Sequence, residues 1–180
     1  MQYFIVKIFK LLKRIRFAVS HFFNQIACKI IFFLNNVSYS EFSTMGLPFV
    51  SVSLGGKLSL GKNLIINNTL SSNPIGRSQR CIFFVKKNAK LMIGDNVGLS
   101  QVAIVCHETI TIEDNVKIGG GVCIYDTDFH SLDPLLRINP LLDTEQKKTS
   151  KVVIKNNAFI GAHSTILKGV TIGENSVIGA

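Results

Sequence analysis

The stretch GGGVCIYDTDFHSLD, residues 119–133, carries the clearest set of residues for proton-transfer chemistry in the chain. His130 is preceded there by Asp126 and Asp128 and is followed by Asp133. An imidazole ring titrates near neutral pH, so it can take the proton of a hydroxyl group as that hydroxyl attacks. Asp126 or Asp128 can fix the tautomer of the ring, although a backbone carbonyl can do the same. Either aspartate can equally contact an acceptor or form a turn.

Aliphatic residues repeat every six positions on both sides of this stretch. They are Ile93, Leu99 and Val105, then Ile112, Ile118 and Ile124, then Ile154, Ile160, Ile166, Ile172 and Ile178. Small or β-branched residues stand four places after most of them, and the words LSLGKN, LMIGDN, ITIEDN, VVIKNN and VTIGEN recur. A period of six fits neither a helix nor a flat strand. It predicts short strands and turns stacked into a solenoid, with Asn and Gly at the turns.

The repeat is interrupted once. Ile124 and Ile154 are an integral number of hexads apart, yet residues 125–152 between them contain prolines, charges and no hexad pattern. We expect the chain to leave the coil there as a loop and to rejoin it in phase. Loops held by a rigid scaffold are where binding and catalytic residues concentrate.

The repeat resembles that of the hexapeptide-repeat acyltransferases, most closely in NVKIGGGVCIYDTDFHSLD and VVIKNNAFIGAHSTILKGVTIGENSVIGA. Within that family, these stretches are similar to the sugar and polysaccharide O-acetyltransferases. The resemblance covers roughly Gly55 to Ala180. It implies an all-β solenoid, a left-handed parallel β-helix, over residues 46–180. Residues 1–45, an amphipathic helix and connector, lie outside the resemblance. The resemblance further implies a homotrimer that binds acetyl-CoA between neighbouring subunits and needs no metal.

The resemblance also implies roles for particular residues. His130 in DTDFH matches the catalytic base of the family. Small residues that let the pantetheine arm approach the backbone match Gly161, Ala162, Gly179 and Ala180. An acceptor-binding Asn of the galactoside enzymes falls near Ser100, a departure that leaves the acceptor sugar open. Lys168 is a phosphate contact or a solvated lysine.

The function that this resemblance implies is transfer of an acetyl group to a sugar hydroxyl. The acceptor is a carbohydrate of capsule, lipopolysaccharide or exopolysaccharide biosynthesis, and the enzyme is cytoplasmic. One alternative is acetylation of an amino-sugar nitrogen, serine or an antibiotic, and another is an inactive β-helix scaffold. The sequence ends in mid-coil, so we expect the solenoid to be incomplete there and to bind acetyl-CoA weakly.

The amino-terminal segment has a different character. The formal net charge is +9, and six Lys or Arg residues precede the first acidic residue, Glu41. Steps of three and four join Ile5, Ile8, Leu12, Ile15, Val19, Phe22, Ile26, Ile30 and Phe33. This spacing predicts an amphipathic helix over residues 1–34. Such a helix packs on its own domain or between subunits, or it lies on the inner face of the cell membrane as a peripheral contact. Nucleic-acid binding fits less well, and no charge-free run reaches the ~20 residues of a membrane span.

Cysteine and histidine add no metal site. The four cysteines form no CxxC pair, and their spacing from the histidines matches no ligand set. We interpret them as reduced thiols of a cytosolic protein. His21, His107 and His163 are expected to be surface residues.

Overall fold

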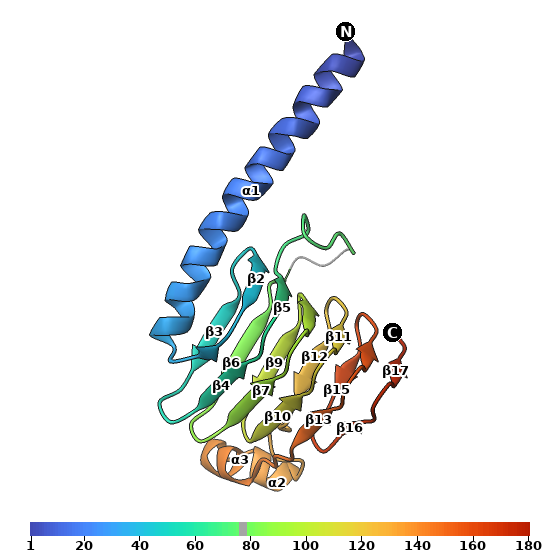
Figure 1. Cartoon of the computed structure of the whole chain (residues 1–180). Helices are drawn as coiled ribbons and strands as arrows, with labels where there is room; N and C mark the ends of the chain where they lie inside the picture. The colour runs from blue at the N-terminus through green and yellow to red at the C-terminus, as the bar shows by residue number, and fades with distance from the viewer. Residues whose placement is uncertain (76–78) are drawn as a thin grey trace.

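The structure, a computed structural model, describes residues 1–75 and 79–180. It consists of one long helix, α1 (Gln2–Leu34), followed by a prism of short strands (Figure 1). Two short helices, α2 (Pro134–Arg137) and α3 (Pro140–Gln146), interrupt the strands.

The strands form three sheets in which every pair of neighbours is parallel. The first sheet contains β1 (Ser38–Tyr39), β4 (Lys57–Leu60), β7 (Lys90–Ile93), β10 (Thr109–Ile112), β13 (Val152–Ile154) and β16 (Thr171–Ile172). The second contains β2 (Phe42–Met45), β5 (Leu64–Asn67), β8 (Gly98–Ser100), β11 (Lys117–Ile118), β14 (Phe159–Ile160) and β17 (Val177–Ile178). The third contains β3 (Phe49–Val52), β6 (Ile82–Val85), β9 (Ala103–Cys106), β12 (Cys123–Tyr125) and β15 (Thr165–Ile166). Consecutive strands fall in successive sheets, so the chain winds as a parallel β-helix, the architecture expected from the six-residue period.

Stacked aliphatic side chains fill the interior of the prism. Ile93, Ile112 and Ile154 are register partners on neighbouring strands, and each is almost fully buried. Replacing one such isoleucine by alanine is expected to destabilise the fold by about 2–5 kcal/mol. The inward position predicted for Val105 is wrong. Val105 is only half-buried, whereas Ile104 is fully buried and pairs with Ile124. The six-residue repeat is therefore shifted by one residue before β9. Because successive side chains of a strand point to opposite faces, this shift turns Ile104 inward and Val105 outward.

The recurring asparagines make the turns that follow the first sheet. Each adopts a left-handed backbone conformation with φ between 54° and 62°, which asparagine tolerates better than most residues; they are Asn63, Asn96, Asn115, Asn157 and Asn175. Their side-chain amides also stack, because each donates a hydrogen bond of 2.9–3.1 Å to the next. The asparagine of each repeat thus joins its turn to the turn of the following coil.

The chain leaves the coil after Tyr125 and returns at Val152, where Ile154 pairs with Ile112. The excursion is more regular than a loop. Asp133 and Asn139 cap α2 and α3 by accepting backbone N–H groups, and a proline follows each cap. The prolines of this segment were a sign of irregular structure in the sequence, but Pro134 and Pro140 are the first residues of α2 and α3.

Helix α1 covers the first coil only with its carboxy-terminal end. Cys28 and Phe32 are its two buried residues, and the preceding half projects beyond the prism (Figure 1). The first strands, β1 and β2, lie upstream of Gly46, so the β-helix begins earlier than the sequence indicated. By length and composition α1 is apolar enough to cross a membrane, a criterion that signal sequences near an amino terminus also meet.

Candidate functional site

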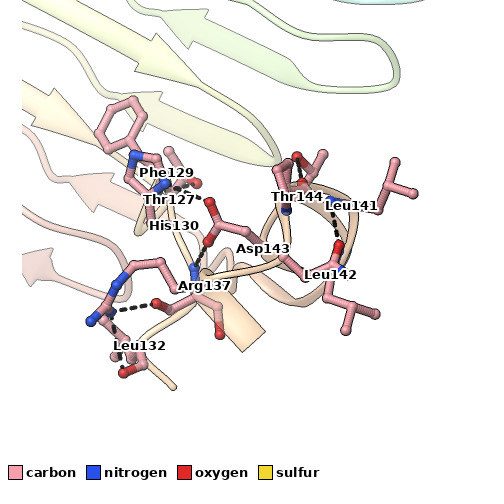
Figure 2. A network of polar contacts seen from close by, with 12 residues as sticks. Thr127, Phe129, His130, Leu132, Arg137, Leu141, Leu142, Asp143 and Thr144 are labelled. Carbon is pink, nitrogen blue, oxygen red and sulfur yellow. Dashed lines mark hydrogen bonds and ion pairs between the residues drawn. The ribbon is translucent and has the colours of Figure 1, made fainter. Parts of the chain in front are cut away.

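The excursion between β12 and β13 holds His130 against a carboxylate. His130 Nδ1 lies 2.7 Å from Oδ2 of Asp143, which is in the first turn of α3 (Figure 2). The histidine side chain is 68% exposed, whereas that of Asp143 is 14% exposed. The ring is therefore fixed at one nitrogen and open to a ligand at the rest of its surface.

Asp143 is itself positioned by the turn that carries the histidine. The backbone N–H of Ser131 donates to Asp143 Oδ1 at 2.6 Å, and Arg137 Nη1 donates to the Ser131 carbonyl at 2.8 Å. The hydrogen bonds from His130 and from Ser131 lower the pKa of Asp143 below its ordinary value. An ionised carboxylate can only accept, so Nδ1 carries the proton and Nε2 is the unprotonated nitrogen of the neutral ring.

The residue before His130 has a strained backbone. Phe129 has φ 63°, a left-handed conformation that is rare for a bulky side chain. Its ring packs edge-on against Tyr125 and His107, with centroids 5.1 Å and 5.9 Å away. This packing anchors the chain to the prism immediately before His130 turns outward. Strain of this kind is concentrated at functional sites.

Asp126 does not contact His130 and is not the carboxylate that orients it. Its side chain is fully buried and accepts the backbone N–H groups of His107 at 2.6 Å and Glu108 at 2.8 Å. The carboxyl group thereby joins the start of the excursion to the turn of the preceding coil. The orienting role predicted for Asp126 or Asp128 belongs to Asp143 in this structure.

Asp128 lies at the base of the excursion. Its Oδ2 is 3.4 Å from Nζ of Lys168, which follows β15 in the next coil. Its backbone N–H donates to the Lys148 carbonyl, on the returning side of the excursion. Asp128 therefore fastens the excursion to the prism, and Lys168 is an ion-pair partner rather than a solvated side chain.

The other predicted site residues lie at a different corner of the prism. Ser100 ends β8 of the second sheet. Gly161 and Gly179 occupy the equivalent register positions directly after β14 and β17, and Ala162 and Ala180 come next in those turns. Ser100 Oγ accepts a hydrogen bond from Asn67 at 3.3 Å and lines a surface hollow with Asn67, Asn73 and Gly119. The excursion that carries His130 leaves the corner after the third sheet instead. In Figure 1 its helices lie below the prism, and residues 68–75, which follow β5, rise above it.

The remaining histidines have distinct surroundings. His163 is exposed, as expected, with its backbone at φ 68°. His21 is half-buried, and its Nδ1 lies 3.1 Å from the Thr44 carbonyl. His107 is half-buried beside Phe84, and burial, Lys86 and Lys147 lower its pKa. The surface location expected for His21 and His107 is therefore wrong.

Sequence reasoning missed Asp143 because it lies thirteen residues beyond His130. The signal was present in NPLLDTE, since Asn-Pro starts a helix and places the following aspartate in its first turn. No group of three metal-ligating side chains occurs in the part of the chain that the structure describes.

Comparison with known proteins adds a family and several relatives. Residues 151–180 match the family model described as bacterial transferase hexapeptide (six repeats), whose fold is the left-handed form of the parallel β-helix. The galactoside O-acetyltransferase of Escherichia coli (strain K12) is 42% identical over 80 residues, which cover 44% of this chain and 36% of the relative. WbbJ of the same organism, named as a candidate lipopolysaccharide biosynthesis O-acetyl transferase, is 30% identical over 129 residues, or 69% of this chain and 60% of the relative.

A third relative, the bifunctional protein GlmU of Wigglesworthia glossinidia brevipalpis, is 28% identical over 152 residues, which cover 72% of this chain and 31% of the relative. The chain therefore spans between about a third and three fifths of the length of these relatives. No solved structure matches the chain closely enough to extend the comparison.

Proposed function

We propose that the chain moves an acetyl group from acetyl-CoA to a hydroxyl of a sugar acceptor, because residues 151–180 match the hexapeptide transferase family model and the chain is similar to O-acetyltransferases. The observation that carries this proposal is the His130–Asp143 pair, which leaves one imidazole nitrogen unprotonated and accessible. The printed name of WbbJ supports an acceptor in surface polysaccharide biosynthesis.

His130 acts as the general base in this proposal. Nε2 takes the proton of the acceptor hydroxyl while the hydroxyl oxygen attacks the thioester carbonyl. The tetrahedral intermediate then collapses, the C–S bond breaks, and the imidazolium returns the proton to the departing thiolate of CoA. Asp143 keeps the ring in the required tautomer and stabilises its charged form during the step.

The donor site is proposed at the turns that follow β14 and β17, at Gly161, Ala162, Gly179 and Ala180. Small side chains there let a thioester arm run close to the backbone. At Gly161 the coil itself also requires glycine, since a Cβ would lie 2.9 Å from the Ile178 carbonyl oxygen. These small residues therefore leave room for the donor but do not require it, and the packing of the coil alone explains the glycine at position 161.

A homotrimer would bring these separated groups together. His130 and the turns after β14 and β17 occupy different corners of one prism, so a neighbouring subunit that places its own turn against the excursion would complete the site. Closed cyclic symmetry repeats that contact three times. The acceptor then lies between subunits, with Asp128 and Ser100 as the proposed contacts from their respective corners.

The test is CoA release by the full chain, measured with a thiol reagent, on a panel of acceptors. We expect release to depend on an added sugar with free hydroxyls. Release only with amino sugars would favour nitrogen acylation, and no release with any acceptor would favour an inactive scaffold. Lys62→Asn is the control for His130→Asn, because Lys62 is exposed in the turn between β4 and β5, away from the excursion and from the turns after β14 and β17.

A further inference from the structure

The outward side of helix α1 is a continuous apolar stripe that the rest of the chain leaves uncovered. The stripe consists of Ile5, Ile8, Leu12, Ile15, Val19, Phe22, Ile26, Ile30 and Phe33, and the exposed fraction of these side chains runs from 42% at Ile8 to 81% at Phe33. Steps of three and four place them on one side of the helix. A run of exposed aliphatic and aromatic side chains of this length marks an interaction surface.

The helix packs on the β-helix with a different side. His21 Nδ1 lies 3.1 Å from the Thr44 carbonyl oxygen, and Gln25 Nε2 donates to the Phe42 carbonyl at 2.8 Å. Cys28 and Phe32 are buried, and the Phe32 ring packs against the Phe42 ring in a tilted arrangement. These four helix residues are spaced by three and four and include no member of the stripe. The stripe is therefore not the face that holds α1 to its own domain.

The charges of α1 all have one sign. Lys7, Lys10, Lys13, Arg14, Arg16 and Lys29 lie within it, and it contains no acidic residue. Lys7, Lys10 and Arg14 continue the side of His21 and Gln25, away from the stripe. One side of the helix is thus basic and the opposite side is apolar along the projecting half.

We propose that α1 lies in the surface of an anionic lipid membrane, with the stripe among the acyl chains and the basic residues among the phosphates. A basic polar face opposite a Phe-, Ile- and Leu-rich face is the composition of helices that bind membrane interfaces. Two copies of α1 meeting along their stripes would cover the apolar side but would leave the basic side without an acidic or anionic partner. A nucleic acid would bind the basic residues and would leave the apolar stripe exposed to water.

Interfacial binding fits the packing better than crossing does. The half of α1 with few charges is the half that contacts Thr44 and Phe42 of β2. A helix that crossed the bilayer with this half would carry the exposed backbone edge of the first coil into hydrocarbon, where unpaired polar groups are strongly unfavourable. An interfacial helix keeps the prism in water.

The experiment is flotation of the full chain with vesicles of phosphatidylglycerol and phosphatidylcholine, compared with phosphatidylcholine alone. We expect flotation with the anionic vesicles and little with the neutral ones. Lys7→Gln, Lys10→Gln and Arg14→Gln together should weaken anionic binding on the order of 10²-fold, since one basic residue near such a surface is worth about fivefold. High salt should release the wild-type chain.

Two double variants isolate the stripe. Ile8→Gln with Ile15→Gln removes two stripe residues, whereas Val6→Gln with Phe17→Gln removes two exposed apolar residues from other sides of the helix. Circular dichroism and the size of the assembly verify that each variant folds. Flotation should fall at least tenfold for the first pair and far less for the second.

Three results would overturn the proposal. Equal flotation with anionic and neutral vesicles would remove the electrostatic part of it. Resistance to extraction by salt and alkaline carbonate would make α1 a spanning helix. A stripe variant that floats normally but changes the size of the assembly in light scattering would assign the stripe to a second copy of the chain.

Discussion

Asp126 offers a sharp test of how the structure divides the aspartates of the DTDFH stretch. Its buried carboxylate accepts the backbone N–H groups of His107 and Glu108, at 2.6 Å and 2.8 Å. Asp126→Ala leaves both N–H groups without this acceptor. A buried donor that loses its partner destabilises a protein by about 1–3 kcal/mol, so the two together amount to about 2–6 kcal/mol.

Urea denaturation followed by circular dichroism measures this loss directly. Asp128→Ala is the control, because it removes a nearby carboxylate whose 3.4 Å contact is an ion pair with Lys168 and not a pair of backbone hydrogen bonds. We expect a large fall in the urea midpoint for Asp126→Ala and a small one for the control. An Asp126→Ala chain as stable as the wild type that has lost its turnover would refute this reasoning and return Asp126 to the acceptor site.

Asp143→Asn should leave the free energy of unfolding close to wild type and lower the turnover number by about 10–10²-fold, because the amide does not fix the tautomer of His130 as an ionised carboxylate does. A variant with normal turnover and an unchanged pH profile of CoA release would remove Asp143 from the mechanism. His107→Phe should reduce the loss of folding free energy on acidification. Burial and two lysines lower the pKa of His107 in the folded chain, so below pH ~6.5 the unfolded chain is protonated first. The wild type therefore loses stability as the pH falls toward the pKa of His107 in the folded chain. Urea midpoints of wild type and variant between pH 7 and 5 check this, and parallel curves would contradict it.

The hexad period was sufficient to predict the β-helix, because stacking of one large aliphatic side chain per strand leaves little choice of architecture. It failed at Val105, where neighbouring Ile104 and Val105 are both aliphatic and the side that faces inward is decided by pairing with Ile124. The amphipathic pattern of residues 1–34 likewise predicted the helix but gave no information on which side would contact the protein. The buried side is the one with His21, Gln25, Cys28 and Phe32, since polar groups of the first coil needed partners there.

The candidate site was predictable in part. His130 is the residue that the sequence indicated, and the structure places it on an excursion from a rigid coil. Its partner was not predictable from proximity in sequence, because Asp126 points inward to cap a turn and the fold of α2 and α3 brings Asp143 back instead. The contacts within the excursion depend on where its helices begin. An interpretation of the segment as an irregular loop gives no helix positions and so does not predict these contacts.

The central claim is that His130 removes the proton of the acceptor hydroxyl during acetyl transfer. The most direct measurement is the rate of CoA release from acetyl-CoA with a saturating hydroxyl acceptor, for wild type, His130→Asn and Lys62→Asn. A fall of ~10²–10⁴-fold is expected for His130→Asn with unchanged stability, while Lys62→Asn keeps the wild-type rate. Equal rates for all three chains would contradict the assignment of His130 as the base.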